Sequence, residues 1–378
     1  MKKYSYLFAA AVLAVSCTKL PHVQVNGTVP GLNDAVFLLT DATGNTVAGD
    51  NIKNGAFKVD TVLENTGYGT LSISKNGDEK KNEFEVYVEP VQYTIEAKPN
   101  KLSSYPKITS TSKIQKELSA YYELYDKISS GARERLEKAK AELNDNRANA
   151  LSKDAYVALI DKVSKAEREE DKTKYEAFET FVKQNPQSVA ATHLMNKLDV
   201  ESDPAAYMAL YQKLSNEAKA TDEGKELGDK LGRLVKLIPG AQAPDIAGTT
   251  PDGKKFSIAG QNKKGYIIDF WRAGNQPSRL NHQDMISVLE QDKYAKQFGI
   301  ISISLDDKRD WWTKAIKDDQ MNWPQYSDLK GDKSLNAQNW MITTIPSYYL
   351  VDANWKIIER NVDYTRILFT TSNYAKKH

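Results

Sequence analysis

The sequence predicts a multidomain chain of mixed α+β structure, with an antiparallel β-domain first, a helical region next and an α/β domain last. Three patterns of apolar residues indicate this order. Apolar and polar residues alternate up to about residue 108, apolar residues recur every three or four positions from 112 to about 237, and short apolar runs alternate with helical stretches from 238 onward. A chain of 378 residues is long enough for two or three domains, each with its own core.

The charge balance argues against binding to nucleic acid. The 52 Lys and Arg residues nearly match the 50 Asp and Glu residues, which leaves a net charge of +2. A nucleic-acid binder normally carries a basic face or a high pI. After the first twenty residues, no apolar stretch of the sequence is long enough to cross a bilayer. We therefore expect a well-hydrated protein that has no nucleic acid among its partners.

The first seventeen residues, MKKYSYLFAAAVLAVSC, have the pattern of a secretory signal. Two lysines precede an apolar run that is too short for a spanning helix, and small residues lead up to Cys17, the only cysteine of the chain. AVSC resembles a lipoprotein box, which implies a signal peptide over 1–16 and a diacylglyceryl group on Cys17. The alternative is an ordinary signal peptide with a chance cysteine near its cleavage site.

A lipid on Cys17 would anchor the chain to a membrane of the cell envelope, because an anchor of several acyl chains is effectively permanent. The residues that follow, TKLPH, include none of the acidic residues that often accompany export of such lipoproteins to the cell surface. We therefore expect an outer membrane lipoprotein that faces the periplasm.

Residues 17–111 contain the predicted β-domain. Six short runs with apolar residues at every second position are separated by turn signals such as NG, TGN and NGD, which predicts strands with one buried face. The runs are HVQVNGTV, AVFLLTD, GAFKVDTVL, GTLSIS, NEFEVYVEP and VQYTIEAKP. Their order resembles the DUF4369 module, which occurs at the N-terminus of thioredoxin-like lipoproteins of Bacteroidota.

Residues 112–237 contain the predicted helical region. One apolar stripe with spacings of three and four runs from Ile114 to Ile128. Between 132 and 150 the residues are mostly Arg, Lys, Glu and Ala, which fits an exposed helical hairpin or short coiled-coil arm, or else a solvated helix face. YEAFETFVKQNPQSVAATHLMNKL predicts a helix, an Asn-Pro stop and a second helix capped by Ser188. No second copy at a fixed period supports a helical repeat.

Residues 238–378 contain the predicted α/β domain. GYIIDFW and FGIISISLD are buried-strand runs, SYYLVD and KIIERNV form a hairpin pair, and helices are expected over 278–297 and 308–319. All six tryptophans fall at or after position 271, as expected for a domain with a compact, rigid fold. Four of them are expected in the core or along a groove: Trp311, Trp312, Trp323 and Trp340.

Four ordered blocks between Pro239 and Val362 resemble the thioredoxin-like family of periplasmic thiol-disulfide oxidoreductases, of the TlpA type, and its AhpC/TSA peroxiredoxin-related cousins. The blocks are GAQAPDIAGTTPDGKKFSIA, IIDFWRAGNQPSR, ISISLDDKRDWWTKAIKDDQMNWPQYSDLKG and TTIPSYYLVDANWKII. The resemblance implies a thioredoxin-like fold, and it places the family's redox site at the turn after the strand that ends in Asp-Phe-Trp.

In that family the turn reads F-W-A-x-W-C-x-x-C-R. Phe270 and Trp271 match this pattern, but Gly274 replaces the tryptophan, and Asn275 and Ser278 stand at the two cysteine positions. Thiol-disulfide exchange needs a thiolate at the helix N-terminus and a second thiol that resolves the mixed disulfide. Neither an amide nor a hydroxyl replaces these groups. We therefore expect no catalytic residue here, and a natural loss of the cysteines, because neighbouring positions have diverged as well.

Other positions of the family's site are kept. Asp269 takes the place of the buried carboxylate beneath the turn, although a strand-end Asp that faces solvent is the alternative. Pro346 matches the cis-proline that faces the turn, and in the family the backbone beside it pairs with an extended peptide. This mode of binding needs no sulfur, so we expect a groove for a peptide or protein partner. Its binding residues are Gly274, Gln276, Pro277, Ile345, Pro346 and Asp269.

One hairpin turn departs from the family pattern. In VDANWK, Trp355 stands where the family usually has Gly. Asn354 tolerates the left-handed conformation, so we expect the turn to be kept.

No other pattern in the sequence indicates an active site, and we expect no metal and no cofactor. The four histidines and one cysteine lack zinc-ligand spacing, and no nucleophile elbow, phosphate-binding loop or dinucleotide fingerprint is present. Ser278 and His282 lie one helical turn apart, yet a serine at a helix start is most simply a cap. Two functions stay open: a non-catalytic binding lipoprotein that uses the groove, and a thiol-disulfide oxidoreductase that acts with thiols supplied by a partner.

Overall fold

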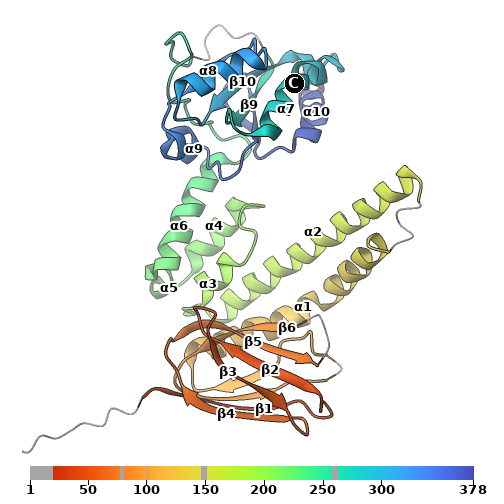
Figure 1. The fold of residues 1–378 in the computed structure, drawn as a ribbon, viewed down its shortest axis with the longest axis vertical. Coiled ribbons are helices and arrows are strands. Elements are labelled where there is room, and N and C mark those ends of the chain that lie inside the picture. Colours follow the sequence, from red (N-terminus) through yellow and green to blue (C-terminus); the bar gives the residue numbers. More distant parts are fainter. Residues whose placement is uncertain (1–19, 77–80, 100, 146–150, 258–262) are drawn as a thin grey trace, which may run out of the picture. The chain divides into compact units, whose positions relative to one another are not determined.

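A computed structural model gives the fold of the chain (Figure 1), and it describes residues 20–76, 81–99, 101–145, 151–257 and 263–378. The predicted signal peptide and Cys17 lie outside these residues. The chain divides into two compact units, one up to Leu194 and one from Met195. The predicted fold class is confirmed, with β-sheets in the N-terminal part, helices in the centre and an α/β domain at the C-terminus.

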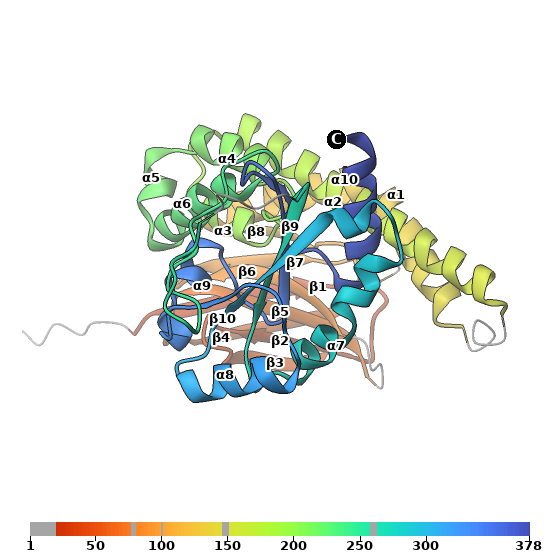
Figure 2. The ribbon, with the colours of Figure 1, turned by 90° about the horizontal axis from the view of Figure 1, so that it is seen from above.

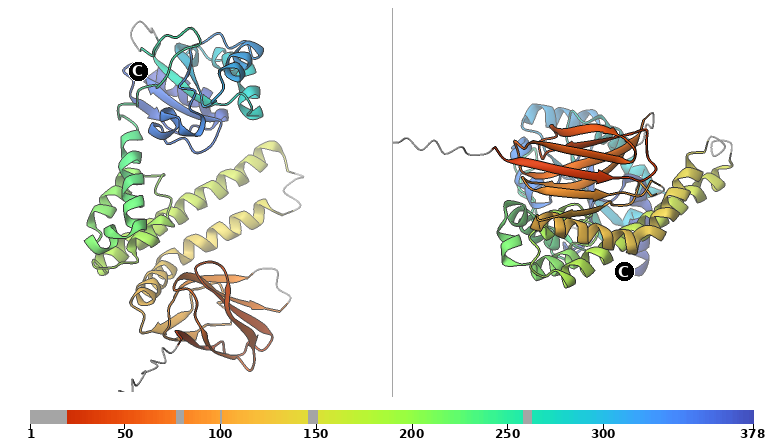
Figure 3. Two further views of the ribbon diagram at one scale, coloured as in Figure 1. Left: turned by 60° about the vertical axis from the view of Figure 1, so that its left-hand side comes forward. Right: turned by 90° about the horizontal axis from the view of Figure 1, so that it is seen from below.

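The first unit contains a β-sandwich of two four-stranded sheets. Its strands are β1 (His22–Thr28), β2 (Ala35–Thr40), β3 (Thr46–Ile52), β4 (Ala56–Val62), β5 (Gly67–Lys75), β6 (Asn82–Val88), β7 (Gln92–Glu96) and β8 (Lys107–Ser110). The strand orders are β4-β1-β7-β8 and β3-β2-β5-β6, and the right-hand view of Figure 3 shows the strands of the sandwich. An apolar core draws on both sheets. Across it, Phe37 stacks on Phe57 with ring centroids 4.1 Å apart.

The sandwich differs from the predicted domain in two ways. It contains β3 and β8, which the alternation in the sequence does not reveal, because β3 has only two buried positions and β8 has four residues. In addition, β1 pairs with β7 in parallel, whereas the other strand pairs of the sandwich are antiparallel. A parallel pair needs a long connection, and the segment from β2 to β6 provides it.

Two long helices, α1 (Lys113–Leu143) and α2 (Lys153–Gln184), pack along each other as a hairpin (Figures 1 and 3). Ser112 caps α1 and Ser152 caps α2, and each side chain accepts a hydrogen bond from the backbone N–H three residues later. Toward the tip, the two helices meet at Leu136, Ala139, Val163 and Ala166. The arm expected over 132–150 is thus a helical hairpin as far as the described residues extend.

α3 (Ala191–Asn196) begins three residues after Ser188, the predicted cap. The carboxylate of Glu117 on α1 accepts hydrogen bonds from the Ser188 hydroxyl at 2.8 Å and from the backbone N–H groups of Val189 and Ala190 at 3.0 Å each. The free N–H groups ahead of the helix are therefore satisfied by a side chain that lies far away in the sequence.

The second unit begins with short helices that are capped by polar side chains. Asp203, Ser215 and Thr221 cap α4 (Pro204–Lys213), α5 (Asn216–Ala220) and α6 (Asp222–Leu234), in that order. An arginine near the end of the chain fixes the segment before α4. Arg360 donates to the backbone carbonyl of Glu201 at 2.9 Å and to its carboxylate at 3.2 Å.

The α/β part of this unit contains a five-stranded mixed sheet with the order β11-β10-β9-β12-β13. The strands are β9 (Gly265–Trp271), β10 (Phe298–Ser304), β11 (Gln325–Ser327), β12 (Ser347–Asp352) and β13 (Ile357–Glu359). β9, β10 and β11 run parallel, β12 is antiparallel to β9, and β13 is antiparallel to β12. The central strand β9 is buried along its whole length, as its apolar run predicts.

Three helices pack on one face of this sheet: α7 (Gln276–Glu290), α8 (Arg309–Asp318) and α10 (Ile367–Lys377) (Figure 2). Right-handed crossovers from β9 to β10 and from β10 to β11 place α7 and α8 on the same side. The other face packs against apolar residues of the segment before β9 and against Trp340 and Trp355. Two faces covered in this way leave the ends of the strands as the place for a site.

The hairpin turn between β12 and β13 is present, but Trp355 itself adopts the left-handed conformation, with a φ of 60°. Its side chain is buried, and its Nε1 donates to the carbonyl oxygen of Pro244 at 3.0 Å. Its ring also packs against Phe256 and Trp340. These contacts offset the cost of a positive φ in a bulky residue.

Candidate functional site at the start of α7

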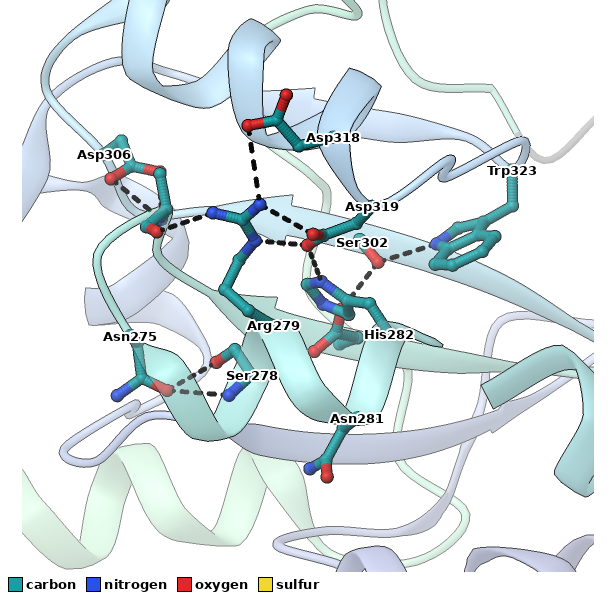
Figure 4. Close-up of polar contacts among 12 residues, drawn as sticks. Asn275, Ser278, Arg279, Asn281, His282, Ser302, Asp306, Asp318, Asp319 and Trp323 are labelled. Carbon is teal, nitrogen blue, oxygen red and sulfur yellow. Dashed lines mark hydrogen bonds and ion pairs between the residues drawn. The ribbon is translucent and has the colours of Figure 1, made fainter. Parts of the chain in front are cut away.

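The candidate site forms where β9 ends and α7 begins (Figure 4). Asn275 is the N-cap of α7, and its side-chain oxygen accepts a hydrogen bond from the backbone N–H of Ser278 at 2.9 Å. Pro277 lies in the first turn, where its missing N–H costs nothing. The expectation that Ser278 is the cap is therefore wrong. Its hydroxyl donates to the same oxygen of Asn275 at 2.8 Å.

Asn275 also joins the turn to the segment that contains Pro346. Its Nδ2 donates to the carbonyl oxygen of Ile345 at 3.3 Å, and the Ile345–Pro346 peptide bond is cis. The two residues at the expected cysteine positions, Asn275 and Ser278, are thus hydrogen-bonded to each other, and Asn275 reaches the residue before the cis-proline. The hydrogen bonds of Asn275 with Ser278 and with Ile345 hold this turn in shape.

An open groove of about 370 Å³ lies beside the turn. Trp311 contributes an indole that is 55% exposed, and the Lys308 ammonium lies 4.1 Å from the centre of that ring. A Cβ atom placed on Gly274 would meet no atom within 4 Å, so this position is open to the groove. Arg272 forms an ion pair with Asp332 at the groove. The groove therefore offers an aromatic face together with charges of both signs.

The predicted binding residues fall into two groups. Gln276 and Pro277 are exposed at the start of α7, and Ile345 and Pro346 are half-buried. None of these four is among the residues that line the groove, whereas Gly274 is. Asp269, in contrast, is fully buried, so it does not reach the surface and can affect a partner only through other residues. The solvent-facing alternative for Asp269 is wrong.

Asp269 lies in a polar cluster beneath the turn. Its Oδ2 accepts a hydrogen bond from the Ser302 hydroxyl on β10 at 2.6 Å and lies 3.0 Å from Nε2 of His282 on α7. The Ser302 hydroxyl in turn accepts from Nε1 of Trp323 at 2.9 Å. Oδ1 of Asp269 has no hydrogen-bond partner among the described residues. Burial of a carboxylate is costly unless a partner compensates its charge, and the imidazole of His282 is placed to do so.

His282 connects Asp269 to a second carboxylate. Its Nδ1 lies 3.3 Å from Oδ2 of Asp319, which directly follows α8, and its side chain is fully buried. Arg279 donates to both carboxylate oxygens of Asp319, with the Nη2 bond at 2.6 Å, and to the carbonyl oxygen of Ala273 at 3.1 Å. Figure 4 shows His282, Asp319 and Arg279 in contact, with Arg279 reaching back toward the turn.

The surroundings of His282 favour its protonated form. Burial lowers the pKa of His282, but the hydrogen bonds and charges of Asp269 and Asp319 together outweigh burial, and the pKa is raised above its ordinary value of 6.5. The hydrogen bond to Asp319 also raises the pKa of Arg279. In the protonated state both ring nitrogens of His282 carry hydrogens, and each faces a carboxylate oxygen.

A third carboxylate holds the turn from the other side. Asp306, which follows β10, accepts hydrogen bonds from the backbone N–H of Ala273 at 3.0 and 3.2 Å and from the Ser304 hydroxyl at 2.7 Å. Ala273 therefore has its N–H bound by Asp306 and its carbonyl bound by Arg279. Two charged side chains from different elements thus fix the backbone just before Gly274.

The cluster beneath the turn is the part of the site that sequence reasoning missed. Ser278 and His282, which lie one helical turn apart, do not contact each other in the hydrogen bonds of the site: the Ser278 hydroxyl bonds to Asn275, and both nitrogens of His282 face carboxylates. The usable signal is Arg279 and His282 three residues apart on one helix, which places two basic groups on one face. Nothing in the sequence marks Asp319 as their partner.

Metal binding and membrane crossing are not evident in the described parts of the chain. No group of three or more His, Cys, Asp or Glu side chains there is placed to hold a metal ion. None of the helices described has both the length and the apolar character required to cross a membrane.

Comparison with known proteins identifies the class of the C-terminal domain. Residues 239–360 match the model of the AhpC/TSA family. The C-terminal domain is therefore an AhpC/TSA-type, thioredoxin-like domain. The match covers the whole site, from β9 and the turn to the cis-proline segment. No curated protein matches the chain.

Three of the solved structures that are similar to the chain come from Bacteroides species. The C-terminal domain of a putative thiol-disulfide oxidoreductase from Bacteroides thetaiotaomicron is 24% identical, with 38% of this chain and 99% of that chain covered and a TM-score of 0.34. The thioredoxin domain of a thiol-disulfide oxidoreductase from Bacteroides vulgatus is 28% identical, with coverages of 37% and 97% and a TM-score of 0.32. A thioredoxin-like protein from Bacteroides caccae is 16% identical, with coverages of 62% and 88% and a TM-score of 0.44.

Proposed function

We propose that this protein is a lipoprotein of the cell envelope, anchored through Cys17 to the outer membrane and facing the periplasm, whose thioredoxin-like domain binds a peptide or protein partner without redox chemistry. The observation that carries the proposal is the hydrogen-bonded pair Asn275 and Ser278. An amide and a hydroxyl bonded to each other occupy the start of α7, where a redox member of this fold needs a reactive thiolate.

The composition of the chain supports the loss of redox chemistry. Cys17 is the only cysteine, and lipidation of its sulfur would leave no thiol for exchange. Disulfide exchange transfers a bond between sulfur atoms, so the domain by itself has no group that can accept it. The alternative, which rests on the AhpC/TSA match of the domain, is an oxidoreductase that acts with thiols supplied by a partner.

The surface beside the turn supports binding. An exposed Trp311 and an open position at Gly274 both line the groove. The carbonyl of Ile345 accepts from Asn275, which keeps the cis-proline segment against the start of α7. Extended peptides bind to such sites through backbone hydrogen bonds, while pockets beside the backbone select side chains.

A redox assay separates the two functions. The protein without residues 1–17 is incubated with insulin and dithiothreitol, and with glutathione and a disulfide peptide. We expect turnover at the level of buffer. The positive control is the double variant Asn275→Cys, Ser278→Cys, which restores a thiol pair on the same scaffold and is expected to show turnover. Turnover by the wild type above buffer with glutathione would overturn the proposal in favour of the alternative.

A capture experiment tests binding. The wild type is expected to retain a periplasmic partner that Gly274→Trp loses, because the new indole would fill the groove. The matched control is Gly232→Trp on α6, where an added Cβ also meets no atom within 4 Å. If both tryptophan variants retain the same proteins as the wild type, the groove is not the binding surface.

A further inference from the structure

The charged side chains of Asp269 and His282 are buried beneath the turn and do not line the groove. Because burial of charge is costly, their charges must be compensated by one another or by neighbouring groups. When His282 is protonated, the charges of Asp269, His282, Asp319 and Arg279 cancel. When His282 is neutral, the cluster carries one uncompensated negative charge, and Asp269 and His282 cannot reach solvent, since both side chains are fully buried. The electrostatic balance of this site therefore depends on one proton.

The geometry makes a neutral His282 unfavourable for a second reason. A neutral imidazole has one N–H and one bare nitrogen. One of the two carboxylates, Asp269 at 3.0 Å or Asp319 at 3.3 Å, would then face a lone pair instead of a donor. The Asp269 carboxylate is held by the Ser302 hydroxyl as well. Asp319, which directly follows α8, has a side chain that is 5% exposed, whereas the Asp269 side chain is fully buried, so Asp319 is the carboxylate nearer to solvent.

The other groups around His282 and Asp269 do not replace the lost charge. On β9, Trp271 contacts the ring edge-on, and Trp323 does so from the segment before β11. On β12, Tyr348 pairs in register with Asp269 and its hydroxyl accepts from Asn281. Burial first, and then the Asp269 charge, raise the pKa of Tyr348, so this phenol stays neutral. Arg279 and Asp318 complete the charged groups on this side.

We propose that His282 is a proton-dependent latch for the binding turn. With a proton on His282, Asp319 is fixed between the imidazolium and Arg279, and Arg279 in turn fixes the carbonyl of Ala273. Without the proton, Asp319 moves toward solvent with Arg279, and the turn from Arg272 to Asn275 loses the hydrogen bond between Arg279 and the carbonyl of Ala273. Regulation of binding by this latch rests on the proposed binding function. The latch itself is a property of the protein without a ligand.

The direction of the effect follows from linkage. The closed state binds the proton of His282 more tightly than the open state, because the open state lacks Asp319, one of the two carboxylates that raise the pKa of His282. The stabilisation of the closed state is therefore fully present below the pKa of His282 in the open state, and it is lost as the pH rises through the higher pKa of the closed state. Between the two pKa values, the equilibrium constant for opening of the turn rises up to about tenfold for each pH unit.

The protonation state of His282 can be measured directly in the full chain. The four histidines are labelled with ¹³C and ¹⁵N, and the His282 signals are assigned from their absence in His282→Gln. In a titration between pH 5 and 9, the wild type is expected to keep two protonated ring nitrogens on His282 to higher pH than an ordinary histidine, whose pKa is about 6.5. A His282 ring that is already neutral at pH 6.5 would overturn the proposal. The titration itself is carried out on the wild type alone.

The coupling to the turn is measured by hydrogen exchange and mass spectrometry on the segment from Trp271 to Asn281, between pH 6 and 9, with rates corrected for intrinsic exchange. In the wild type, protection is expected to fall with pH along the His282 titration. In His282→Gln it is expected to be low and independent of pH. The matched control, His193→Gln, replaces a histidine of the first unit and should keep the wild-type profile.

Two results separate this inference from the binding proposal. Protection that stays constant while His282 titrates would overturn the latch, whatever the groove binds. Protection that follows the His282 titration supports the latch even if no partner is captured, because neither measurement includes a ligand. If His282→Gln fails to fold, Asp319→Asn serves instead, since it removes the same link between His282 and Arg279.

Discussion

Substitution of Asn275 should separate the helix cap from the contact across the turn. In Asn275→Ala, the backbone N–H and the hydroxyl of Ser278 lose their acceptor, and the carbonyl of Ile345 loses a donor. The lost N-cap costs about 1 kcal/mol, and the lost hydrogen bond to the carbonyl of Ile345 costs about 1 kcal/mol. We therefore expect the free energy of unfolding of the second unit to fall by about 2 kcal/mol.

Asn275→Asp is the matched comparison. A carboxylate keeps the cap and interacts favourably with the helix N-terminus by about 0.5 kcal/mol, but it has no N–H for the carbonyl of Ile345. The free energy of unfolding of Asn275→Asp should therefore lie within about 1 kcal/mol of the wild-type value. Asn275→Ser, whose side chain caps well but is too short to reach Ile345, should fall between the two.

The assay is denaturant unfolding followed by tryptophan fluorescence. All six tryptophans lie at or after position 271, so the signal reports on the second unit alone. This matters because a chain with two compact units need not unfold in a single step. If Asn275→Ala and Asn275→Asp shift the transition equally, or if the alanine variant loses less than about 0.5 kcal/mol, a value usual for surface changes, the inferred role of Asn275 is wrong.

Three further outcomes follow from the site. Ser302→Ala removes the shared partner of Asp269 and Trp323, so it should lower the free energy of unfolding by about 1 to 3 kcal/mol. Ser287→Ala, on the exposed part of α7, should lower it by less than about 0.5 kcal/mol. Unfolding followed by tryptophan fluorescence compares the two variants. Trp311→Ala should weaken capture of the partner with little change in the unfolding transition, because the indole is 55% exposed; an unchanged capture would remove Trp311 from the binding surface. The free energy of unfolding of the second unit should decrease as the pH rises through the raised pKa of His282, and this decrease should be absent in His282→Gln.

Local patterns in the sequence were sufficient for much of the second unit. The apolar run of β9 predicts a strand buried on both faces, and the helix expected over 278–297 corresponds to α7, which begins two residues earlier and ends at Glu290. The four ordered blocks also predict a thioredoxin-like arrangement with a cis-proline at Pro346, and the cis bond is present. These features depend on residues that are near one another in sequence or on a motif of fixed order.

The features that sequence reasoning missed depend on partners that are distant in sequence. Asp269, His282 and Asp319 come from three different elements, and residue types alone do not say that they meet. Glu117 on α1 accepts hydrogen bonds from the N–H groups ahead of α3, although α2 lies between the two helices in the sequence. The parallel pairing of β1 with β7 is another such case, because alternation predicts strands but not their neighbours.

The hydrogen-bonded pair Asn275 and Ser278 gives the turn a property that two cysteines could not provide. A dithiol and a disulfide differ in covalent structure, so a cysteine pair changes its shape with the reduction potential around it. An amide and a hydroxyl undergo no such change. The surface at the start of α7 therefore keeps one shape in oxidising and in reducing surroundings, and a partner that binds there meets the same surface in both.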